Sequence, residues 1–103
     1  MSQSKFTVIA GPCVIEDEGL TLEIAQELKN QLKDVPVEFY FKASFDKANR
    51  SSFDGFRGPG MTNGLEILKK VKNKTDHLLL TDVHLPDQVS RVAEVVDCIQ
   101  IPA

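Results

Sequence analysis

The chain has 103 residues with 12 basic and 15 acidic side chains, so its length allows a single domain, and its net charge of −3 gives no general attraction for nucleic acid or anionic lipid. Its apolar stretches run for only a few residues, whereas a membrane-spanning helix needs about 20, and the N-terminus lacks the apolar segment of a secretory signal. We therefore expect a cytoplasmic protein whose partners include neither nucleic acid nor a membrane.

The hydrophobic pattern predicts strands that alternate with helices along the chain. The strands are expected at residues 5–10, 37–43, 78–83 and 98–101. Apolar residues at helical spacing predict a helix from Leu20 to about Lys33, a second helix after Gly60 and a third after Pro86. This order implies right-handed crossovers and a parallel sheet, which is an α/β fold. The strands are apolar throughout, which predicts that both faces of the sheet are covered.

The connection from Ser44 to Gly60 is unusually long and basic. It has about 17 residues, whereas loops between a strand and a helix usually take about 2–6. Residues 42–57 carry four basic and two acidic side chains. Because lysine and arginine pair with carboxylate and phosphate oxygens, the segment is predicted to bind a small anion. The alternative is a solvated loop with incidental charge, and Gly58-Pro59-Gly60 is expected to form a plain turn.

Polar side chains follow each predicted strand, at the edge of a parallel sheet where ligands bind. They are Cys13, Lys42, Ser44, Asp82, His84 and Gln100. Asp82 and His84 occupy alternate positions, so either they form a hydrogen-bonded pair or Asp82 caps the turn after its strand.

Each of the two cysteines needs its own interpretation, because a disulfide is not expected in a reducing compartment. Cys13 is either a small buried hydrophobe or, from its place after the Gly11-Pro12 turn, a metal ligand or reactive thiol. Cys98 begins a strand and is expected in the core. His77 precedes a strand at the opposite edge and is expected on the surface.

Five motifs together are similar to a known family. They are Ile9-Ala10-Gly11-Pro12-Cys13-Val14-Ile15-Glu16, the block from Phe41 to Ser52, Arg57-Gly58-Pro59-Gly60, Thr81-Asp82-Val83-His84 and Ile99-Gln100-Ile101-Pro102-Ala103. With them the chain resembles the first part of the 3-deoxy-D-manno-octulosonate 8-phosphate synthases. The resemblance implies a (β/α)₈ TIM barrel, of which residues 1–103 would form the N-terminal half of a single domain, with about four strands and three helices.

The same resemblance implies a transferase that condenses phosphoenolpyruvate with D-arabinose 5-phosphate and water, releasing phosphate and supplying lipopolysaccharide biosynthesis. Members are usually homotetramers. Lys42, Ser44 and Lys47 would bind phosphoenolpyruvate, and Asn49 would hold the sugar. Arg50 and Ser51 would bind the phosphate of arabinose 5-phosphate. Asp82 and Gln100, with His84 near them, would line the cavity, and the backbone N–H of Ala103 would approach a phosphate. The catalytic roles would fall to Lys42, Lys47, Asn49 and Asp82.

Cys13 matches the metal-ligand position of the metal-dependent class, which implies a divalent cofactor such as zinc, iron or manganese. The other ligands of that class, a His, a Glu and an Asp, are not matched in this sequence, nor are its later Lys and Arg. The 103 residues alone are therefore expected to be inactive. Two alternatives stay open. One is a non-catalytic half-barrel that binds phosphate or serves in assembly. The other is the related seven-carbon sugar synthase that uses erythrose 4-phosphate.

Overall fold

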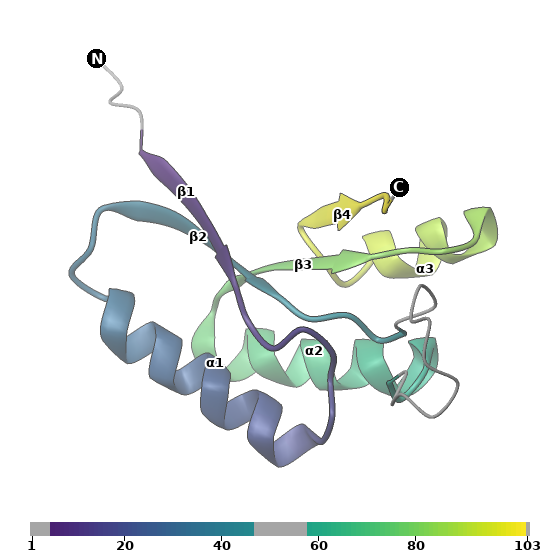
Figure 1. The fold of residues 1–103 in the computed structure, drawn as a ribbon, viewed down its shortest axis with the longest axis horizontal. Coiled ribbons are helices and arrows are strands. Elements are labelled where there is room, and N and C mark those ends of the chain that lie inside the picture. Colours follow the sequence, from purple (N-terminus) through teal and green to yellow (C-terminus); the bar gives the residue numbers. More distant parts are fainter. Residues whose placement is uncertain (1–4, 47–57, 103) are drawn as a thin grey trace.

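The computed structural model describes residues 5–46 and 58–102. Four strands form one parallel sheet in the order β1-β2-β3-β4, with β1 at Phe6–Ala10, β2 at Val37–Lys42, β3 at Leu78–Asp82 and β4 at Cys98–Gln100. The helices α1 (Glu18–Leu32), α2 (Met61–Thr75) and α3 (Val89–Ala93) alternate with the strands, and a 3₁₀ turn at Pro86–Gln88 leads into α3 (Figure 1). The predicted α/β order is confirmed, and it is consistent with part of a TIM barrel.

Local sequence explains where α1 begins and where α2 ends. The side chain of Asp17 caps α1 by accepting a 2.9 Å hydrogen bond from the backbone N–H of Leu20. Helix α2 ends at Asp76, which adopts a left-handed conformation with φ of 61° and donates its N–H to the carbonyl of Lys72. An exposed ion pair of 2.8 Å joins Lys70 of α2 to Glu18 of α1.

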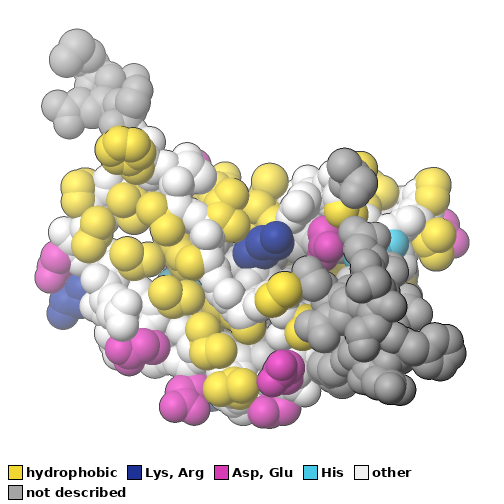
Figure 2. Space-filling view, viewed as in Figure 1, with side chains coloured by type: hydrophobic (Ala, Val, Ile, Leu, Met, Phe, Trp, Pro, Cys, Tyr) yellow, Lys and Arg dark blue, Asp and Glu magenta, His cyan; other side chains and the backbone are white. Residues whose placement is uncertain are grey.

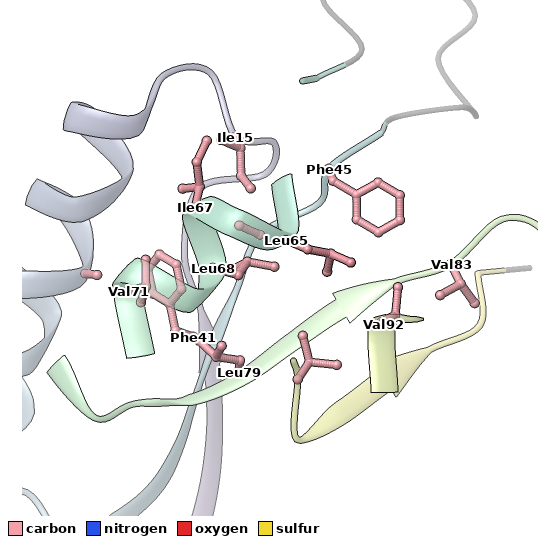
Figure 3. Packing of buried hydrophobic residues seen from close by; sticks show 13 residues of the cluster. Ile15, Phe41, Phe45, Leu65, Ile67, Leu68, Val71, Leu79, Val83 and Val92 are labelled. Carbon is pink, nitrogen blue, oxygen red and sulfur yellow. The ribbon is translucent and has the colours of Figure 1, made fainter. Parts of the chain in front are cut away.

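One hydrophobic core lies between the sheet and all three helices. Figure 3 shows its largest members, with Phe41 and Leu79 on the strands facing Leu68 and Val71 of α2. Ala25 of α1 belongs to the same cluster, as does Val92 of α3. Burial of these side chains fixes the helices on one face of the sheet, because each helix has a single apolar stripe to cover.

The other face of the sheet carries no helix within the described residues, so the covering that the sequence predicts for both faces is seen here on one face. Along β2, Phe39 and Phe41 contact the core, whereas Glu38, Tyr40 and Lys42 point to the opposite face because side chains alternate along a strand. Strand β2 looks apolar in the sequence because bulky residues such as Phe39 and Phe41 alternate in it with polar ones. The polar side chains of β2 therefore lie on the face opposite the helices.

Two placements differ from expectation. Cys98 pairs in register with Leu80 and is exposed, so the prediction that it belongs to the core is wrong. Its place opposite Leu80 puts it on the face without helices. His77 is half-buried rather than on the surface. Its ring lies 4.9 Å from that of Phe39 and its Nε2 lies 2.9 Å from the carbonyl oxygen of Ala25. That contact ties β3 to α1.

Apolar side chains also reach the surface, and Figure 2 shows them gathered over β1 and α1. Phe6 is 85% exposed and Ile9 is 50% exposed on β1, and Leu20 of α1 is 41% exposed. No helix among residues 5–46 and 58–102 has the length and apolar character needed to cross a membrane.

The substitution Gly64→Ala in α2 is expected to destabilise the protein, although alanine normally favours a helix over glycine by about 1 kcal/mol. A Cβ at position 64 would overlap the Cβ of Phe45, whose side chain is 1% exposed. Overpacking costs about 1–3 kcal/mol. Overlap with the Cβ of a buried residue belongs to the upper end of that range, so after the gain from alanine the free energy of unfolding should fall by about 1–2 kcal/mol in a denaturant titration.

Gly19→Ala in α1 is the matched control. The nearest atom to a Cβ there is Oδ1 of Asp17 at 3.3 Å, so a shift of a few tenths of an ångström accommodates it and leaves the cap on the N–H of Leu20 in place. This variant should be as stable as the parent. A Gly64→Ala variant of equal stability would contradict the close packing of α2 on Phe45.

Candidate functional site

The turn after β1 is pressed against the end of β2. A Cβ at Gly11 would meet the backbone carbonyl of Lys42, so only glycine allows this approach. Beyond the turn, the carbonyl of Cys13 accepts a 3.3 Å hydrogen bond from the N–H of Ser44, and the N–H of Ile15 donates to the carbonyl of Ser44 at 3.0 Å. These bonds hold Cys13 and Ser44 together at the carboxyl edge of the sheet, as the sequence predicts.

Lys42 is the last residue of β2 and lies on the face without helices. It pairs in register with Leu80, which pairs in turn with Cys98. Lys42 is half-buried at this edge of the sheet, so part of its apolar stem is shielded from water. Tyr40 shares this face. The carboxylate of Glu38 raises the pKa of the Tyr40 phenol further above neutrality, and the phenol, which is uncharged near pH 7 in any case, adds no charge near Lys42.

Asp82 ends β3, and its side chain is 8% exposed. Its Oδ2 lies 3.5 Å from Nε2 of His84, whose side chain is 12% exposed. The two side chains are neighbours, but this distance is longer than a good hydrogen bond, and Nε2 of His84 makes its 2.7 Å contact with the backbone carbonyl oxygen of Asp46 instead. The alternative, in which Asp82 caps the turn, is not what the structure has. The side chain of Gln88 takes that role by accepting hydrogen bonds from the N–H groups of His84 and Leu85 at 2.8 and 3.2 Å.

Two buried oxygen atoms at this edge have no hydrogen-bond partner within the described part of the chain. They are Oγ of Ser44, in a residue that is 0% exposed, and Oδ1 of Asp82, in a residue that is 6% exposed. A buried polar atom without a partner costs about 1–3 kcal/mol. An ordered water, an ion or a ligand can supply the missing partner of such an atom. Both belong to residues that the sequence placed at the site.

Gln100 lies directly opposite Asp82 in the register of β3 and β4, so the two side chains share the face that carries Lys42. Gln100 is exposed, and its backbone carbonyl accepts a 3.2 Å hydrogen bond from the N–H of Val83. Lys42, Asp82 and Gln100 therefore come from three neighbouring strands to one edge. This is the gathering that the sequence predicts.

Cys13 is exposed, so the interpretation as a buried hydrophobe is wrong. Within residues 5–46 and 58–102, no group of three or more His, Cys, Asp or Glu side chains is arranged to hold a metal ion. A tetrahedral metal site needs about three or four protein ligands. The donor set of the described residues alone therefore does not make a metal site.

Five predicted site residues lie outside the described residues. They are Lys47, Asn49, Arg50, Ser51 and Ala103. The structure adds two contributors that the sequence did not single out. Gln88 holds the turn that carries His84, and Thr81 donates a 2.7 Å hydrogen bond from Oγ1 to the carbonyl of Ala43, joining the ends of β2 and β3. The sequence did not identify Gln88 or Thr81, because each side chain bonds to a backbone group, and such partners leave no motif in the sequence.

The arrangement suits an anion that also carries hydroxyl groups. An ammonium group offers attraction to carboxylate or phosphate, while the carboxylate of Asp82 accepts hydrogen bonds from hydroxyls. The Ser44 hydroxyl can donate or accept.

A comparison with protein families matches residues 2–103 to the model described as the DAHP synthetase I family. The chain belongs to the DAHP synthetase I family. Proteins of this family are TIM barrels, which accounts for the parallel sheet and for helices on one face alone.

Several curated relatives carry the name 2-dehydro-3-deoxyphosphooctonate aldolase. One from Desulfatibacillum aliphaticivorans is 58% identical over 96 residues, which are 93% of this chain and 35% of the relative. One from Campylobacter jejuni serotype O:6 is 52% identical over 99 residues, 96% of this chain and 36% of the relative. One from Wolinella succinogenes is 52% identical over 96 residues, 93% of this chain and 36% of the relative. This member of the DAHP synthetase I family thus spans about a third of the length of these relatives.

Proposed function

We propose that this chain forms part of an enzyme that condenses phosphoenolpyruvate with D-arabinose 5-phosphate and water, giving 3-deoxy-D-manno-octulosonate 8-phosphate and inorganic phosphate. Support comes from the relatives, which match nearly the whole chain at 52–58% identity and are named for this product. The observation that carries the proposal is a pair of buried oxygens, Ser44 Oγ and Asp82 Oδ1, which have no hydrogen-bond partner among the described residues and lie on the edge where Lys42 ends β2.

In this reaction the enol carbon of phosphoenolpyruvate attacks the sugar aldehyde, water adds to the adjacent carbon, and the resulting hemiketal phosphate collapses with C–O cleavage. The protein mainly positions the reactants and stabilises charge. We assign the ammonium of Lys42 and the hydroxyl of Ser44 to phosphoenolpyruvate. The carboxylate of Asp82 and the amide of Gln100 are assigned to the sugar, since they lie opposite each other on β3 and β4.

The remaining contacts of the proposed site lie outside the described residues. The proposal gives Lys47 a second charge contact to phosphoenolpyruvate and gives Asn49 a contact to the sugar. Arg50 and Ser51 would bind the sugar phosphate, and the N–H of Ala103 would approach the phosphate of phosphoenolpyruvate. A homotetramer in the cytoplasm completes the proposal, and sizing of the purified protein tests its oligomeric part.

We also propose that Cys13 supplies one ligand of a divalent metal. Its thiol is exposed at the edge where Ser44 is held, so it is open to a metal. The other ligands would come from outside the described residues, because those residues hold no group of three donors. A metal bound there would act as a Lewis acid that orients the aldehyde or the water.

The test uses the protein at its natural full length and measures the phosphate that it releases. Release from phosphoenolpyruvate is expected to require D-arabinose 5-phosphate and to fall upon chelation. A Cys13→Ser variant should bind less metal, as measured by elemental analysis. Activity that survives exhaustive chelation would count against the metal while leaving the condensation intact.

Erythrose 4-phosphate provides the control for the sugar. Faster turnover with erythrose 4-phosphate would replace the proposal with the seven-carbon sugar synthase. No turnover with either sugar, in a folded protein, would favour a phosphate-binding or assembly module.

A further inference from the structure

The imidazole of His84 bridges the ends of two strands. Its Nε2 lies 2.7 Å from the backbone carbonyl oxygen of Asp46, beyond β2, and 3.5 Å from Oδ2 of Asp82, at the end of β3. The ring also packs edge-on against Phe45, with 6.5 Å between ring centroids. Its own backbone is fixed by the side chain of Gln88 at 2.8 Å. His84 is therefore held from four directions.

The contact with Asp46 determines which nitrogen carries the hydrogen. A carbonyl oxygen only accepts hydrogen bonds, so the 2.7 Å contact requires a hydrogen on Nε2 of His84. The positive edge of this N–H also faces the carboxylate of Asp82. While the contact holds, Nε2 has no lone pair for a substrate proton or for a metal. Nδ1 is then the one ring nitrogen left for any direct contact with a substrate.

We propose that His84 is a positioning residue: its Nε2–H donates to the backbone carbonyl of Asp46 and lies against the Asp82 carboxylate, and so sets the spacing between the ends of β2 and β3. This role differs from the substrate contact that the family resemblance implies for His84. Ser44 lies two residues before Asp46, so the same tie fixes its buried hydroxyl relative to Oδ1 of Asp82. The catalytic consequence rests on the proposed condensation activity.

Two amide substitutions separate positioning from direct contact. The side-chain amide of glutamine places an N–H near the location of Nε2, whereas that of asparagine places one near Nδ1. His84→Gln can therefore still donate to the Asp46 carbonyl, and His84→Asn cannot. We expect kcat/KM to fall about 10- to 100-fold in His84→Asn, as for residues that orient a neighbouring functional group, and by less than about threefold in His84→Gln.

The pH dependence of kcat/KM supplies a second readout. His84→Gln should keep the pH profile of the parent, because the imidazole exchanges no proton with the substrate. Three results would overturn the proposal: greater activity in His84→Asn than in His84→Gln, equal large losses in both folded variants, or no loss in either. A changed pH profile in His84→Gln would also overturn it.

Nitrogen NMR of the imidazoles tests the same tie without any turnover. His84 should show the Nε2–H tautomer, assigned as the signal that disappears in His84→Gln and distinguished in this way from His77. An Nδ1–H tautomer would overturn the proposal. A parent protein that releases no phosphate but shows the Nε2–H tautomer would refute the proposed function and leave the structural tie standing.

Discussion

Replacing Lys42 by methionine is expected to lower kcat/KM for phosphoenolpyruvate by about 100- to 1000-fold. Phosphoenolpyruvate, the proposed substrate, carries a carboxylate and a phosphate, and Lys42 is the cation that β2 delivers to the face of the sheet opposite the helices. One pair of opposite charges about 4 Å apart is worth about 4 kcal/mol at an effective dielectric constant of about 20. Each tenfold change in rate corresponds to about 1.4 kcal/mol, so most of that interaction should be visible in initial rates.

Methionine keeps most of the lysine stem, which is half-buried, so the fold should tolerate it. Lys69→Met removes the same charge from the outer surface of α2, where the side chain is 53% exposed and pairs with Glu66. This control should stay within about twofold of the parent in activity, because surface pairs contribute little. A Lys42→Met protein with the parent's thermal midpoint and near-parent activity would remove Lys42 from the site.

The gathering of polar groups at one edge was predictable because it follows from strand direction. Once β2, β3 and β4 are parallel, the residues at their carboxyl ends meet, and this places Lys42, Asp82 and Gln100 together. The element order was predictable from hydrophobic spacing for the same reason. Both predictions rest on the spacing of apolar residues and on the rule that parallel strands end at the same edge of the sheet. Neither requires a distance between two residues.

The misplaced residues depend on strand register and on long-range contacts. Cys98 is exposed because its register with Leu80 puts it on the face without helices, and one residue of slip would reverse that. His77 is half-buried because its Nε2 meets the carbonyl of Ala25, 52 residues away in the chain. Every residue has a backbone carbonyl, so the sequence does not show which one a side chain will bind. The contact between His84 and the carbonyl of Asp46 could not be predicted for the same reason.

The substitution Asp82→Asn is expected to lower kcat/KM by about 100-fold and to leave the protein at least as stable as the parent. Oδ1 of Asp82 is buried without a partner among the described residues, and Oδ2 has the 3.5 Å contact with His84. A buried carboxylate that is poorly paired costs free energy of folding. A neutral amide of the same shape lowers this cost. It also gives up the charge that strengthens hydrogen bonds from substrate hydroxyls.

Asp97→Asn supplies the matched control on the opposite edge of the sheet. Oδ2 of Asp97 accepts hydrogen bonds from the N–H of Leu79 at 2.9 Å and from Nζ of Lys72 at 3.2 Å. Asparagine keeps an acceptor for Leu79 and loses only a half-exposed ion pair, so stability should fall by less than about 1 kcal/mol. Activity should be unchanged.

Opposite effects on stability and activity distinguish a binding group from a structural one. A group kept for its ligand is left unsatisfied in the free protein, so its removal relieves the fold while it damages function. If Asp82→Asn loses stability and activity together, as measured by denaturant unfolding and initial rates, the carboxylate serves the fold. If only activity falls, the carboxylate serves the ligand. Oδ1 of Asp82, which has no partner among the described residues, then gains its hydrogen bond when a substrate hydroxyl binds to it.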